Sequence, residues 1–262
     1  MNTSVSNQTF VPASARPRRG FRWWTLIGVT LGLVLIMGVT GTVAYVAGLT
    51  GYAPLALAFA PITLALVVIF SWRREWNLLG FRRPVFTSSA RPVLLVALLP
   101  VVVLSLSLDT KAGGLAIVGF AGLALLVAFV EESLFRGVLL RSFASSGWIP
   151  AVTITSAAFA LAHSVTAISP DADLGAVIRT VLFAFLFGIV AALSTLLTNS
   201  ILPAMVLHAA FDFAGFIMMP RSAALTDAVS IAMCAALAVL LVVVKAREGH
   251  TSQLQKAGGY GQ

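Results

Sequence analysis

The sequence has little charge and almost no cysteine. Only 10% of its 262 residues are charged and 59% are hydrophobic, whereas roughly a quarter of the residues in an ordinary soluble domain are charged. A water-soluble fold of this length could not bury so much apolar surface. The single cysteine, Cys234, excludes an intrachain disulfide, and its place in an apolar run predicts an inert, buried thiol. CxxC and Walker-type motifs are absent from the sequence, so it carries no signal for a redox or nucleotide-binding site.

Apolar runs occupy nearly the whole chain. Eight of them approach the ~20 residues that a helix needs to cross a bilayer. They fall at about 24–46, 53–71, 92–108, 114–135, 149–168, 176–197, 201–219 and 227–244. The predicted fold class is all-α, a polytopic transmembrane helical bundle of about eight spans. We expect one transmembrane domain over 23–246, a disordered cytoplasmic tail over 1–22 and a second cytoplasmic tail over 247–262.

The net charge of +8 raises the question of a nucleic-acid partner, which the positions of the basic residues answer. Fourteen of the 17 Lys and Arg fall on one side of an eight-span path, and Lys111, Arg179 and Arg221 fall on the other. The positive-inside rule then places both termini in the cytoplasm. We therefore predict a multi-pass protein of the cell membrane with no nucleic-acid partner.

The longest loop on the predicted cytoplasmic side covers residues 72–91. Its run WRREWNLLGFRRP mixes basic and apolar residues, a pattern that suits a short interfacial helix. A loop that only anchors the topology explains the pattern equally well.

Few ionisable residues lie within the predicted spans, and each costs on the order of 3 kcal/mol near the bilayer centre, so each is a candidate for function. They are Glu131, Glu132 and Arg136 on the fourth span, His163 on the fifth, and His208 and Asp212 on the seventh. Residues four apart share a helix face, so Glu132 should face Arg136 while Glu131 points away without a local partner. Glu131 is the better candidate for a general base, and the Glu132–Arg136 pair for a supporting role.

The depth of these groups predicts one shared site. The turn between the fourth and fifth spans centres near Gly147, midway between Glu131 and His163, so these two should face each other. His208 and Asp212 lie roughly 10–18 Å into the seventh span at 1.5 Å per residue. We expect all four to meet in a cavity open to the cytoplasmic side. A lone His163 or His208 is more often a hydrogen-bonded core residue, and Glu132 with Arg136 could be only a helix-end salt bridge. Glu131, an adjacent acid without a partner, has no such explanation, and no common structural explanation covers the whole set.

At these residues the chain resembles the CPBP or Abi family, which includes the Ras-converting CAAX endopeptidase. The family signature is EExxxR, then FxxxH, then HxxxN or HxxxD, on separate transmembrane helices. Here EESLFR begins at Glu131, FALAH begins at Phe159, and HAAFD begins at His208. The resembling core covers about residues 115–220.

The resemblance implies an all-helical membrane endopeptidase in which Glu131 and His163 activate a water while His208 and Asp212 help to hold the oxyanion. An ionised Asp212 would repel an oxyanion, so this residue is either protonated or orients His208. Phe159 is expected to be a packing residue, with substrate binding as the alternative.

Metal dependence is a further question, because His163, His208 and Glu131 could bind zinc as a His₂-carboxylate site. There is no HExxH motif. We expect glutamate-dependent hydrolysis without a cofactor, and a zinc enzyme is the alternative.

The expected partners are the lipid bilayer and a membrane protein or peptide substrate, prenylated or CAAX-like. Two other functions stay open. A non-catalytic membrane scaffold or bacteriocin-immunity protein would be favoured by loss of Glu131, His163 or His208, and all three are present. An ion-coupled transporter would be favoured by inverted repeats, of which the sequence shows none that is convincing.

Overall fold

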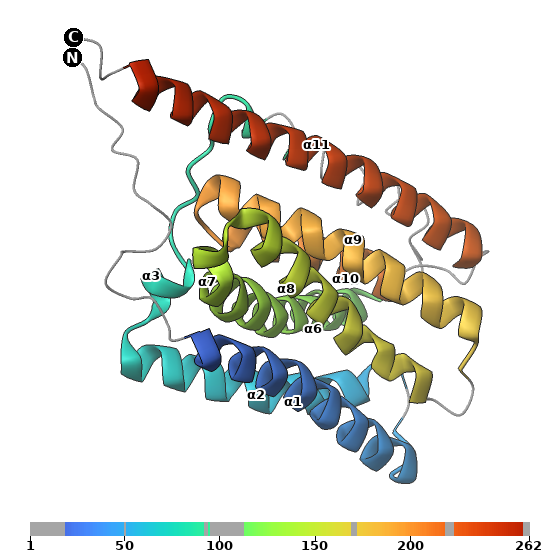
Figure 1. Ribbon diagram of the computed structural model, residues 1–262. Helices are drawn as coiled ribbons and strands as arrows, with labels where there is room; N and C mark the ends of the chain where they lie inside the picture. Colours follow the sequence, from blue (N-terminus) through green and yellow to red (C-terminus); the bar gives the residue numbers. More distant parts are fainter. Residues whose placement is uncertain are drawn as a thin grey trace.

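The computed structural model describes residues 19–49, 51–91, 94, 113–168, 172–217 and 223–258, and within them the chain is helical, without a strand. The prediction of an all-α helical bundle is confirmed (Figure 1). The helices are α1 (Arg19–Val46), α2 (Ala53–Arg73), α3 (Trp76–Leu79), α6 (Gly114–Glu132), α7 (Leu140–Phe143), α8 (Trp148–His163), α9 (Leu174–Thr198), α10 (Leu202–Ile217) and α11 (Ala223–Gly258). A π-helix, η2 (Ser133–Leu139), and two 3₁₀ segments, η3 (Ala144–Ser146) and η4 (Ser164–Ile168), complete the described elements.

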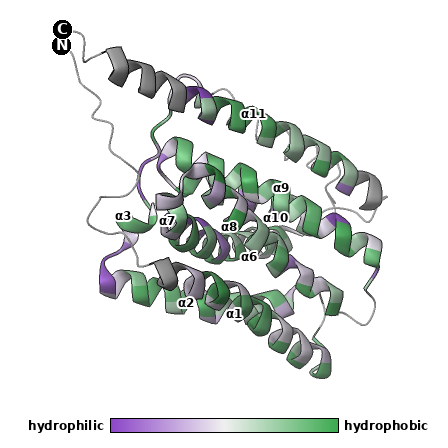
Figure 2. Cartoon of the chain, viewed as in Figure 1, coloured by the Kyte–Doolittle hydropathy of each residue, from purple (hydrophilic) through white to green (hydrophobic). Residues whose placement is uncertain are grey.

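Six of the described helical segments are long and apolar enough to cross a membrane. They are Trp23–Val46, Ala53–Arg73, Gly114–Ser146, Trp148–Ile168, Leu174–Thr198 and Asp227–Glu248, and Figure 2 shows apolar residues along them. A seventh predicted span, 201–219, forms the 16-residue apolar helix α10. The eighth, 92–108, lies outside the described residues. The chain is therefore a multi-pass membrane protein.

The helices pack around α9, which is the most deeply buried of the candidate spans. The helices α8, α10 and α11 all contact α9, and α10 also packs against α6. The helix α2 packs against both α6 and α1. α1 begins and α11 ends at the same end of the bundle, with α3 nearby (Figure 1). α11 continues as helix to Gly258, beyond the span boundary expected at residue 246.

The loop after α2 is fixed to the turn between α9 and α10. Of the two interpretations left open for residues 72–91, the structure shows the short helix, as α3. After it, the backbone N–H of Ile201 donates to the carbonyl of Gly80 at 3.1 Å, and the hydroxyl of Ser200 donates to the carbonyl of Arg82 at 2.6 Å. The Arg82 guanidinium also donates to the backbone and side-chain oxygens of Asn199. The beginning of α10 is therefore held in place from outside the bundle.

Candidate active site

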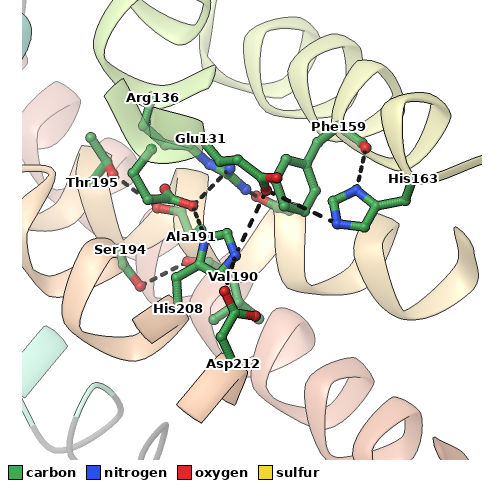
Figure 3. A network of polar contacts seen from close by, with 12 residues as sticks. Glu131, Arg136, Phe159, His163, Val190, Ala191, Ser194, Thr195, His208 and Asp212 are labelled. Atoms are coloured by element: carbon green, nitrogen blue, oxygen red, sulfur yellow. Dashed lines mark hydrogen bonds and ion pairs between the residues drawn. The ribbon is translucent and has the colours of Figure 1, made fainter. Parts of the chain in front are cut away.

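The predicted candidate residues come together from three helical segments (Figure 3). Glu131 and Glu132 are the last two residues of α6, and Arg136 follows in η2, where the helix widens to the π form. π-helical turns are frequent at functional sites. His163 ends α8, and His208 and Asp212 lie on α10.

Glu132 connects two of these segments. Nη1 of Arg136 donates to Glu132 Oε1 at 3.0 Å, which confirms the predicted i,i+4 pair. Nδ1 of His208 lies 2.8 Å from the same oxygen. The side chains of Glu132 and Arg136 are 0% and 1% exposed, so their charges depend on each other for compensation. Glu132 thus fixes both Arg136 and His208, a second role that helical periodicity did not predict.

Both histidines direct the same ring atom at Glu131. Nδ1 of His163 lies 2.9 Å from the carbonyl oxygen of Phe159, which can only accept, so His163 donates through Nδ1. His208 likewise donates through Nδ1 to the carboxylate of Glu132. The two Nε2 atoms then face Oε2 of Glu131, at 4.0 Å from His163 and 3.7 Å from His208. The predicted approach of Glu131 and His163 is confirmed.

Asp212 completes this arrangement, with Oδ2 at 3.6 Å from Nε2 of His208. The three distances that surround Nε2 of His208 and Oε2 of Glu131 exceed the length of a direct hydrogen bond. Among the described residues, neither Oε2 of Glu131 nor Oδ2 of Asp212 has a hydrogen-bond partner, although both atoms are buried. Buried polar atoms of this kind call for an explanation, and catalysis is one of those that apply.

The site is reached from the side of His163 and Asp212. These side chains are 29% and 24% exposed, against 8% for Glu131 and 6% for His208. That the opening faces the cytoplasm stays a prediction.

Aromatic rings line the buried side of the site. Phe159 is 1% exposed, and its ring centroid lies 4.4 Å from Cζ of Arg136 and 4.6 Å from the His163 ring. Phe187 of α9 contacts the His208 ring at 5.0 Å. Phe159 therefore packs against side chains of the site, and substrate binding by Phe159 stays a prediction.

α9 contributes to the site in a way that no sequence pattern singled out. Nη2 of Arg136 donates to the carbonyl of Gly188 at 3.2 Å. A Cβ at position 188 would lie 3.0 Å from Cα and Cβ of Ser156, so glycine is what allows α9 to approach α8. The polar residues of α9 near the site, Ser194 and Thr195, donate to carbonyls of their own helix (Figure 3). The one available signal was a glycine between large apolar residues, which ordinary helix packing also explains.

No group of three or more His, Cys, Asp and Glu side chains in the described part of the chain is arranged to hold a metal ion. Activity without a bound metal stays a prediction.

Comparison with known proteins agrees with the geometry. A search of the curated proteins finds no match to this chain. Residues 113–214 match the model of the family described as type II CAAX prenyl endopeptidase Rce1-like. The matched segment begins just before α6 and ends just after Asp212, so it contains every ionisable group of the site. Over residues 113–214 the chain is therefore similar to the Rce1-like family of CAAX prenyl endopeptidases.

Proposed function

We propose that the protein is an intramembrane endopeptidase that cleaves membrane-associated, prenylated or CAAX-like substrates with water activated by Glu131 and His163. The match of residues 113–214 to a protease family supports peptidase activity. The observation that carries the mechanism is the direction of the two imidazoles, since both Nε2 atoms face one carboxylate oxygen of Glu131.

Water activation follows from the hydrogen-bonding capacity of these atoms. Because Nδ1 of His163 donates to the Phe159 carbonyl, Nε2 of the neutral ring is an acceptor. A water between His163 Nε2 and Glu131 Oε2 would donate one hydrogen to each and direct a lone pair at the substrate carbonyl. Glu131 would take the proton during attack and return it to the leaving amine, and such general acid–base catalysis contributes about 10²–10⁴-fold.

His208 and Asp212 are then placed for the oxyanion. Glu132 already sets the orientation of His208 through Nδ1, at 2.8 Å, so Asp212 is not needed for that purpose. We assign the oxyanion to His208 in its doubly protonated form, which donates through Nε2 while Nδ1 donates to Glu132. Asp212 in its neutral form would donate the second hydrogen bond. Donors fixed before the reaction stabilise the developing charge because they need not reorganise.

The proposal extends to the setting of the enzyme. We place the enzyme in the cell membrane with both termini in the cytoplasm and propose that it acts on a membrane protein or peptide. The enzyme itself would need no bound metal. The uneven distribution of basic residues supports this orientation.

The test is a comparison of two Glu→Gln variants in cells. Glu131→Gln removes the proposed base, whereas Glu75→Gln makes the same chemical change at a glutamate that pairs with Arg73 outside the site. Quantitative proteomics of the membranes should show uncleaved substrates accumulating with Glu131→Gln and not with Glu75→Gln. The purified wild-type protein in nanodiscs should cleave a farnesylated CAAX peptide.

Identical membrane proteomes for the wild type and Glu131→Gln, together with no cleavage of the peptide, would contradict peptidase activity. Accumulating substrates that carry no prenyl group would contradict the proposed substrate class alone.

A further inference from the structure

A cavity lies outside the candidate active site. Its volume is about 500 Å³, within the range of pockets that hold small organic ligands. One wall is α1, through Met37, Gly38, Gly41, Thr42 and Tyr45. The rest comes from Leu49 in the loop after α1, from the beginning of α2 and from η4. These parts of α1, α2 and η4 lie at the end of the bundle away from α3 (Figure 1).

The wall formed by α1 is apolar and lined in part by bare backbone. A Cβ added at Gly38 or Gly41 would meet no atom within 4 Å. The Thr42 hydroxyl donates to the carbonyl of Gly38 at 2.9 Å, so its hydrogen is used within the helix. Water gains little in such a cavity because it needs two to four polar partners.

The position of the cavity in the membrane indicates its occupant. α1, α2 and the α8–η4 segment are all membrane-spanning by length and composition. From Tyr45 to Met37, eight residues of helix cover about 12 Å, less than half of the ~30 Å hydrocarbon core. Tyr45 is 74% exposed near the end of its span, where tyrosine side chains mark the level of the lipid headgroups.

We propose that this cavity binds the acyl chain of a bilayer lipid, which lies along α1 from Tyr45 to Met37 within one leaflet. An unfilled gap between helices would forfeit dispersion contacts along its whole lining. A flexible hydrocarbon chain restores them against glycine backbone, where no side chain projects. The chain would also contact Val165 and Ile168 of η4, the turn that directly follows His163.

Photolabelling can test this assignment independently of peptidase activity. The full-length protein is placed in phosphatidylcholine nanodiscs that contain a small fraction of phosphatidylcholine with a diazirine midway along one acyl chain. After illumination, mass spectrometry should find the label concentrated on the segment Met37–Tyr45.

Leucine substitutions supply matched variants. Gly38→Leu and Gly41→Leu, tested separately, should fill the cavity and abolish labelling of this segment. Gly32→Leu is the control, since a Cβ there also meets no atom within 4 Å but Gly32 does not line the cavity. Its labelling should equal that of the wild type. The thermal unfolding temperature of each variant verifies that it has folded.

Four results would overturn the proposal. Labelling could be spread evenly along the exposed face of α1, or could persist in both cavity-filling variants that fold. Cross-links between two copies of the chain at Gly38–Tyr45 would make a second protomer the occupant. Labelling that a farnesylated peptide displaces would assign the cavity to the substrate instead.

Discussion

The two adjacent acids differ in their partners, so they should differ in the effect of the same substitution. Glu131→Gln keeps the size of the side chain and should abolish cleavage while the folded yield stays that of the wild type. Glu132→Gln removes the charge that compensates Arg136 and leaves a single uncharged oxygen to accept from both Arg136 and His208. Breaking a buried pair in this way costs about 3–5 kcal/mol, so this variant should lose stability as well as activity.

Peptide cleavage and thermal unfolding in nanodiscs, measured on both variants, separate the two roles. Full activity of Glu131→Gln, with equal yields of both variants, would rule the assignment out.

Asp212 allows a second test at the level of one side chain. If its neutral form donates to the oxyanion, Asp212→Asn keeps a donor at the same place and should retain most of the activity. Asp212→Leu has no donor, and loss of one oxyanion donor costs about 10²–10³ in kcat. Steady-state kinetics would contradict the role if the asparagine variant were as slow as the leucine variant.

Local geometry decided which of these contacts could be predicted from the sequence. Glu132 and Arg136 are four apart on one helical segment, so their pairing follows from periodicity. The bond from His208 to Glu132 joins residues 76 positions apart, and no local pattern encodes how two helices are rotated toward each other. For the same reason Gly188 was not predicted, although its carbonyl accepts from Arg136.

At the level of elements, the close approach of α8 and α9 supports the site. Gly188→Ala would place a methyl group 3.0 Å from backbone and side-chain atoms of Ser156, and overpacking of this kind typically costs about 1–3 kcal/mol. The displaced carbonyl should also weaken the hold on Arg136 and lower kcat. Gly122→Ala on α6 is the control, because a Cβ there meets no atom within 4 Å. Equal unfolding temperatures and kcat values for the two variants would contradict this role of Gly188.

The π-helix η2 shows a different limit of sequence interpretation. An apolar run at 114–135 predicts a regular span, and α6 does run regularly to Glu132. The segment from Ser133 to Leu139 widens to the π form where it contacts α1, α3 and α8, and such contacts between distant segments are not visible in a local sequence pattern. The Glu132–Arg136 pair forms as predicted although Arg136 lies within η2.

For the whole molecule, composition and span length predicted the architecture well, because a bilayer requires long apolar helices.

The predicted orientation of the protein in the membrane depends on the distribution of basic residues, and cysteine labelling can test it. In a Cys234→Ala background, Ser88→Cys and Ala172→Cys place thiols at exposed positions on opposite predicted sides. A probe that cannot cross the membrane should label intact cells only at position 172. Labelling only at position 88 would mean that the orientation is reversed.

Metal dependence is also a property of the whole protein, and pH cannot reveal it. The proposed mechanism needs an ionised Glu131 and a neutral His163 together, so activity should fall in acid as either takes up a proton. A zinc enzyme would behave in the same way, because protons compete with metal for histidine.

The metal content of the purified protein separates the metal-free mechanism from a zinc mechanism. After treatment with a strong chelator, purified protein should keep its activity with far less than one metal ion per chain by elemental analysis. If activity disappears with the metal and returns with zinc, His163, His208 and a carboxylate are ligands, and a metal-bound hydroxide replaces the glutamate-activated water.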